Sequence, residues 1–166
     1  MRMNLKEKIN QDYKEAFKAK EEKKVAVLRL LNAAIKNREL EKRTKLSKSM
    51  TDIAELEKQS QLTDEEVSAV LNSEVKRRRD SIEQYQQGGR PELAAQEEAE
   101  LKILSVYLPE QMGEEELRQI VADSIKESGA AGAADLGKVM KVLMPRVKGK
   151  ANGGLVSKIV KEELER

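Results

Sequence analysis

Apolar side chains recur at intervals of three and four residues along most of this chain, with charged residues between them. The first two runs are Leu5, Ile9, Tyr13, Ala16 and Phe17, then Val25, Leu28, Leu31 and Ile35. This spacing places side chains on one face of an α-helix, whereas a half-buried strand requires strict alternation. Aromatic residues make up 2% of the chain and charged residues 37%, a composition that suits thin helical cores better than sheets. We therefore predict an all-α protein.

Local start and stop signals divide the first two thirds of the chain into helices. Thr63 is followed three residues later by Glu66, the pattern of a capping box at a helix start. Gly88 and Gly89 predict the end of that helix, and Pro91 predicts the start of the next. The polar segment 43–61 has weak periodicity, so it either continues the second helix or forms a separate short helix.

Proline marks the predicted domain boundary. Pro109 disfavours helical backbone at Leu108, so we expect an N-terminal helical domain over 1–108, a hinge over 109–113 and a C-terminal three-helix bundle over 114–166. Apolar spacing and glycines predict that the first of these three helices ends near Gly129. The second is expected to end before Pro145, and the third begins after Gly154.

The C-terminal part of the chain carries an excess of positive charge. The stretch 136–161 contains seven cations and no acidic residue, although the net charge of the whole protein is only +2. These cations are Lys138, Lys141, Arg146, Lys148, Lys150, Lys158 and Lys161. A field of one sign favours an anionic partner. The charged residues between Asp80 and Leu117 are mostly acidic, which either solubilises the helices or lets this region mask the basic one.

The most specific interpretation of these cations is a phosphate-binding loop. Between Arg146 and Asn152 the chain combines cations, a glycine and a helix-capping asparagine, and backbone amides at a helix start attract anions. We predict that nucleic acid binds Lys138, Lys141, Arg146, Lys148, Lys150 and Asn152. Lys158 and Lys161 are more simply interpreted as a solvated helix face. The few aromatic residues are expected in the core rather than stacked on bases, so recognition should be by RNA shape and phosphate.

Several functions are disfavoured by residues that the chain lacks. Without cysteine there are no disulfides or thiolates, and without histidine the commonest general base and metal ligand is missing. We predict no catalytic residue, no metal and no cofactor. No apolar run approaches the ~20 residues of a membrane span, and the N-terminus shows no apolar signal core. The expected location is the cytoplasm.

One buried charge is also expected. Arg78 falls on the apolar line of its predicted helix, so it should pair with a carboxylate inside the bundle. Glu74 and Asp80 are the nearest candidates along the sequence.

Short motifs along nearly the whole chain resemble a known family. They are Val27 to Leu31, Lys36-Asn37, Leu62 to Val67, Arg79 to Ile82, Tyr107 to Gln111, Gly137 to Met140, Met144 to Gly153 and Leu155-Val156. These motifs resemble the YqeY-like proteins, which are similar to the tail domain of the B subunit of tRNA-dependent amidotransferases. The segment 43–61 is longer than in that family, and Gly113 stands where serine is expected.

The resemblance implies a helical domain followed by a tail domain and association with tRNA. It also implies carbon–nitrogen ligase activity with glutamine as amide donor, but the sequence shows no set of catalytic residues for that reaction. Three hypotheses follow: a non-catalytic tRNA-binding accessory protein, a module that binds an aminoacyl-tRNA synthetase or an amidotransferase, and a glutamine-dependent ligase.

Overall fold

The chain is helical throughout the part that a computed structural model describes, residues 3–109 and 111–165, and contains no strand there. The prediction of an all-α protein is confirmed. The helices group into two units, Met1–Leu108 and Pro109–Arg166, and each is described by itself. Glu110, inside the predicted hinge, lies outside the described residues.

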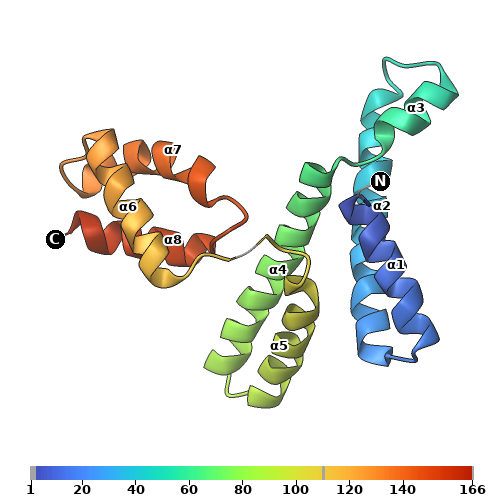
Figure 1. The fold of residues 1–166 in the computed structure, drawn as a ribbon, viewed down its shortest axis with the longest axis horizontal. Helices are drawn as coiled ribbons and strands as arrows, with labels where there is room; N and C mark the ends of the chain where they lie inside the picture. The colour runs from blue at the N-terminus through green and yellow to red at the C-terminus, as the bar shows by residue number, and fades with distance from the viewer. Residues whose placement is uncertain (1–2, 110, 166) are drawn as a thin grey trace. The chain divides into compact units, whose positions relative to one another are not determined.

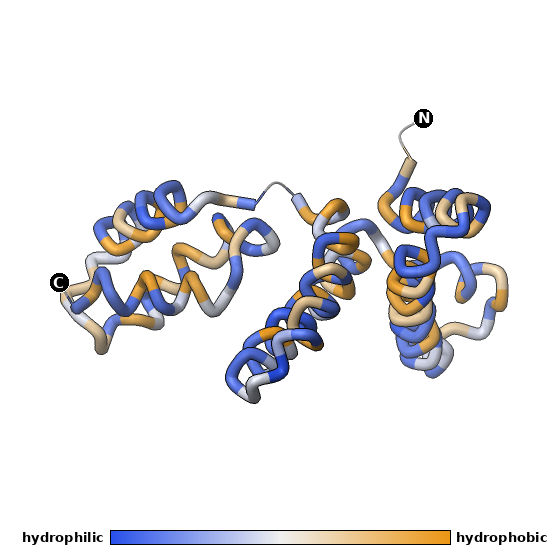
Figure 2. Tube along the Cα trace, turned by 90° about the horizontal axis from the view of Figure 1, so that it is seen from below, coloured by the Kyte–Doolittle hydropathy of each residue, from blue (hydrophilic) through white to orange (hydrophobic). Residues whose placement is uncertain are grey.

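The N-terminal unit contains two helical hairpins and a short connecting helix. Its helices are α1 (Leu5–Lys18), α2 (Glu22–Leu46), α3 (Ile53–Ser60), α4 (Asp64–Gln87) and α5 (Pro91–Ser105). Helix α1 packs against α2, and α4 packs along α5 (Figure 1). Hydrophobic and hydrophilic residues are interspersed along these helices (Figure 2).

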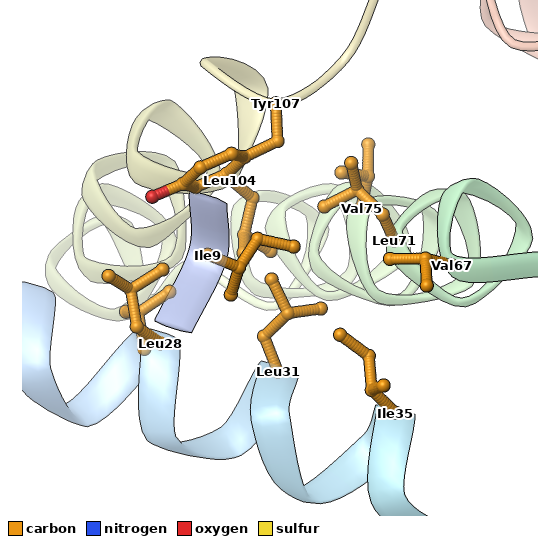
Figure 3. Close-up of a cluster of buried hydrophobic side chains, with 10 residues drawn as sticks. Ile9, Leu28, Leu31, Ile35, Val67, Leu71, Val75, Leu104 and Tyr107 are labelled. Carbon is orange, nitrogen blue, oxygen red and sulfur yellow. The ribbon is translucent and has the colours of Figure 1, made fainter. Parts of the chain in front are cut away.

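One apolar cluster joins the two hairpins. Ile9 of α1 is fully buried among side chains of α2, α4 and α5 (Figure 3). The cluster consists of Ile9, Val27, Leu28, Leu31, Ile35, Val67, Leu71, Val75, Leu104 and Tyr107. The Tyr107 hydroxyl donates a hydrogen bond of 2.6 Å to the Asp12 carboxylate, so the end of the unit is fastened to α1. Burial and this hydrogen bond to a carboxylate both raise the pKa of Tyr107.

The predicted helix boundaries largely hold in this unit. The Thr63 hydroxyl accepts a bond from the Glu66 amide at 3.3 Å, and the Glu66 carboxylate accepts one from the Thr63 amide at 2.8 Å. Helix α4 ends before Gly88, and Pro91 is the first residue of α5. The ambiguous segment 43–61 does both things considered for it: α2 continues to Leu46, and α3 is a separate helix.

Arg78 is buried as predicted, with 6% of its surface exposed. Its guanidinium lies 3.3 Å from the Glu74 carboxylate and 3.1 Å from that of Glu100 on α5. Asp80, the other predicted partner, is exposed. Helical geometry explains the difference, because a residue two positions away points to another side of the helix, whereas a residue four positions away shares the face.

The C-terminal unit is a three-helix bundle. It contains α6 (Glu114–Ser128), a 3₁₀ turn η1 (Ala133–Asp135), α7 (Leu136–Val147) and α8 (Gly153–Leu164). Its core is Leu117, Val121, Val139, Leu143, Val147, Val156, Ile159 and Val160. Gly129 ends α6 with φ +66°, the left-handed conformation common at helix ends.

Helix α7 does not stop before Pro145, and that prediction was wrong. Proline removes one backbone donor, but Pro145 lies in the last turn, where few further helical bonds remain to be broken. The Lys148 amide still donates to the Met144 carbonyl at 3.0 Å, and Val147 is 2% exposed. Burial of Val147 therefore holds the last turn in place.

Candidate nucleic-acid interface

The predicted phosphate-binding residues all lie in the C-terminal unit, on α7 and on the loop that leads to α8. Lys138 and Lys141 belong to α7, and Arg146 lies near its end. Lys148 and Lys150 follow in the loop, and Asn152 caps α8. The structure thus places the six residues within one helix and the connection that follows it.

Two of the predicted cations are already engaged by acidic residues. The Arg146 guanidinium lies 2.5 Å from the Glu127 carboxylate on α6, and the Lys138 ammonium lies 2.7 Å from Asp135. The pKa of the Asp135 carboxyl is lowered, first by a hydrogen bond from the Ala131 amide and then by Lys138. These carboxylates partly neutralise Lys138 and Arg146, which makes the two cations weaker candidates for phosphate binding than unpaired ones.

Three of the predicted cations are available. Lys141, Lys148 and Lys150 are exposed, and none of them forms an ion pair within the described part of the chain. A lysine without an ion-pair partner gives up no existing contact when it binds an external anion. This makes Lys141, Lys148 and Lys150 the strongest members of the predicted set.

Hydrogen bonds to its backbone carbonyls fix the loop that carries Lys148 and Lys150. The Gln111 side-chain amide donates to the Gly149 carbonyl at 3.0 Å, and the Met112 amide donates to the Lys150 carbonyl at 2.8 Å. Gly149 turns the chain with φ +78°, a conformation that glycine adopts without strain. The loop is therefore held in one shape and loses less conformational entropy on binding.

Sequence reasoning missed Gln111 and Met112 as parts of this site. Both lie in the segment predicted as a hinge, and helices α6 and α7 separate them in the sequence from the loop that they contact. Pairing between a coil segment and a loop 38 residues later leaves no periodic signal in the sequence.

Asn152 caps α8, as the sequence predicted. Its side-chain oxygen accepts a hydrogen bond from the Gly154 amide at 2.9 Å, which caps α8. This bond fixes the start of the helix, and binding of Asn152 to nucleic acid stays a prediction. The exposed positive end of α8 lies beside the lysine loop, and the helix dipole favours anions there.

The described residues show no grouping of three or more acidic side chains arranged to hold a metal ion. Nor is any helix among residues 3–109 and 111–165 long and apolar enough to cross a lipid bilayer.

Comparison with known proteins gives a family match over almost the entire chain. The family described as Yqey-like protein matches residues 6–164. The protein named altered inheritance of mitochondria protein 41, mitochondrial, from Pyrenophora tritici-repentis (strain Pt-1C-BFP), is 27% identical over 158 residues. That alignment covers 93% of this chain and 78% of the relative.

Proposed function

This chain belongs to the Yqey-like protein family, and we propose that it is a non-catalytic accessory protein that binds tRNA through the C-terminal unit. The observation that carries the proposal is the fixed loop between α7 and α8, where Lys148 and Lys150 are exposed and unpaired within the described residues. Lys141 on α7 adds a third such charge. Phosphate contacts supply most of the sequence-independent affinity of proteins for nucleic acids.

The experiment is binding of bulk tRNA across a salt series. Each lysine–phosphate contact contributes a slope of about −0.7 to −0.9 to the plot of log affinity against log salt. Lys148→Glu combined with Lys150→Glu should make the slope shallower by about 1.4 or more. The matched control is Lys158→Glu with Lys161→Glu on α8, which changes the net charge by the same amount outside the loop.

The outcome separates a specific site from general charge attraction. A large loss in the loop variant and a small loss in the control support the proposal. Equal losses in both variants, or binding that salt does not weaken, would refute it. Glutaminase activity of the purified chain would contradict the non-catalytic part.

A second candidate function is a module that binds an aminoacyl-tRNA synthetase or an amidotransferase, and a groove on the N-terminal unit favours it. One hollow of about 480 Å³ lies between α2 and α4, and an adjoining hollow of about 450 Å³ is lined by α2, α4 and α5. Ala34 and Asn37 line both hollows, and Leu30, 58% exposed, lines the second. Both hollows combine a few apolar side chains with charged and polar ones, and protein interfaces have a similar mixture of apolar and polar surface.

The test of this candidate is recovery of a partner after nuclease treatment. Leu30→Glu should abolish recovery, whereas Leu40→Glu, at a leucine of α2 that is 51% exposed and lies outside the residues lining both hollows, should not. A partner lost with the RNA would instead support the tRNA proposal.

The cytoplasmic location expected from the sequence stays a prediction. The Pyrenophora relative is named as a mitochondrial protein.

A further inference from the structure

Phe17 projects from the end of α1 into solvent, contrary to the prediction that it belongs to the core. Its surface is 63% exposed, whereas the neighbouring Ala16 is 1% exposed. The Phe17 ring centroid lies 6.4 Å from that of Tyr13, and Tyr13 packs against the apolar cluster of the N-terminal unit. The exposed ring is thus attached to a rigid part of the fold.

Three lysines lie near this end of α1. Lys14 precedes Phe17 by three residues, so the two side chains are neighbours on the helix surface, whereas Lys18, the next residue, points about 100° further around the helix. Lys20 follows in the turn before α2. All three are exposed, and none forms an ion pair within the described residues.

The nearby acidic residues do not neutralise these lysines. Glu15 lies two positions from Phe17, which places it toward the opposite side of α1, and it accepts a hydrogen bond from Gln11. The Glu21 carboxylate lies 3.5 Å from Lys24. Glu22 begins the next helix.

The backbone at Lys20 adds an independent observation. Lys20 has φ +58° and is the one non-glycine residue with positive φ among those described. The Lys20 amide donates to the Phe17 carbonyl at 3.3 Å and the Glu21 amide to the Ala16 carbonyl at 3.0 Å, which is the Schellman arrangement that usually holds glycine. A lysine here costs conformational energy but keeps a cation close to Phe17, and strained residues cluster at functional sites.

We propose that Phe17 stacks on an unpaired nucleobase of a single-stranded nucleic acid while Lys14, Lys18 and Lys20 contact its phosphates. An exposed aromatic ring among cations is the arrangement used by proteins that bind single strands. A membrane surface fits less well, because interfacial helices bury a broad apolar face and α1 turns its other apolar side chains inward. The proposal concerns a different unit from the lysine loop and does not depend on it.

The experiment uses Phe17→Trp as a reporter, since the chain contains no tryptophan. Stacking on a base should quench the tryptophan emission when a single-stranded RNA of about eight nucleotides is added. Affinity for the same RNA, measured by anisotropy of a labelled strand, should fall about five- to hundredfold in Phe17→Ala. Phe17→Leu, which remains apolar but cannot stack, should lose nearly as much.

Controls distinguish this site from general attraction and from the lysine loop. Ile53→Ala removes a side chain that is 70% exposed beside acidic Asp52 and Glu55, and should leave binding unchanged. Lys14→Glu with Lys18→Glu should weaken binding and flatten its salt dependence. The quench should persist in the Lys148→Glu, Lys150→Glu variant, so failure of the tRNA proposal would not affect it.

Three results would overturn the proposal. They are an emission from Phe17→Trp that RNA does not change, equal affinities of Phe17→Ala and the native chain, and a blue shift of the emission with phosphatidylserine vesicles without any response to RNA. The last would assign the surface to membranes.

Discussion

Replacing Lys20 by glycine should make the N-terminal unit more stable. With φ +58°, the backbone of Lys20 is in the left-handed region. This conformation costs a residue other than glycine about 1–2 kcal/mol, because the Cβ lies too close to the following carbonyl oxygen. Glycine avoids this cost but has about 0.4–1 kcal/mol more backbone entropy to lose on folding. The expected net gain is about 0.5–1 kcal/mol, because the other bonds of the Schellman turn are made by backbone atoms.

The assay can observe this unit alone. Tyr13, Tyr85 and Tyr107 are the three tyrosines of the chain and all precede the boundary at Leu108, so tyrosine fluorescence follows unfolding of the N-terminal unit. A gain of this size corresponds to a rise in Tm of about 2–8 °C for a domain of roughly 100 residues.

Lys20→Ala is the control, since it removes the charge but keeps the Cβ. Its Tm should remain near that of the native chain, whereas binding of single-stranded RNA should weaken in both variants. A glycine variant that melts no higher than the alanine variant would refute the argument from backbone strain.

Three further predictions concern stability. Arg78→Met should destabilise the N-terminal unit by about 3 kcal/mol or more, because it leaves the buried Glu74 carboxylate and the half-buried Glu100 carboxylate without their buried cation; adding Glu74→Gln should recover part of this in tyrosine-monitored urea unfolding. Leu143→Ala should cost the C-terminal unit about 2–5 kcal/mol, seen by circular dichroism, while the tyrosine transition stays unchanged. The hydrogen bond from Lys42 lowers the pKa of Glu66 from its usual value of 4.5. A carboxyl group whose pKa is lower in the folded state stabilises the fold at pH values above its unfolded-state pKa, and this stabilisation is lost as the pH falls through its folded-state pKa. Native Tm should therefore fall more steeply below pH 4.5 than that of Lys42→Met, and parallel curves would contradict this.

Local chemistry made much of the fold predictable. The capping box at Thr63 and Glu66 and the stop at Gly88 involve residues within a few positions of each other, and all appear as expected. Such signals work because a helix end must satisfy its own free amides and carbonyls wherever it lies in the fold.

Exposure and charge pairing were harder to predict, because they depend on neighbours distant in sequence. The periodic pattern places Phe17 at the edge of the apolar stripe of α1, but it cannot tell whether another helix covers that edge. Glu127 neutralises Arg146 from 19 residues away, which a count of charges along 136–161 does not reveal. The sequence therefore identified the basic segment, while the structure identified its unpaired lysines.

The unpaired lysines of the two units allow a quantitative distinction between one RNA partner and two. Lys141, Lys148 and Lys150 form one group, and Lys14, Lys18 and Lys20 form the other. If both groups contact the same RNA, their contributions to the salt slope add, giving about −4 for six contacts at −0.7 each. Combining Lys14→Glu and Lys18→Glu with the loop variant should then reduce the slope for tRNA beyond either pair alone. If each unit binds its own ligand, the α1 variant leaves the tRNA slope unchanged and alters only the binding of short single strands.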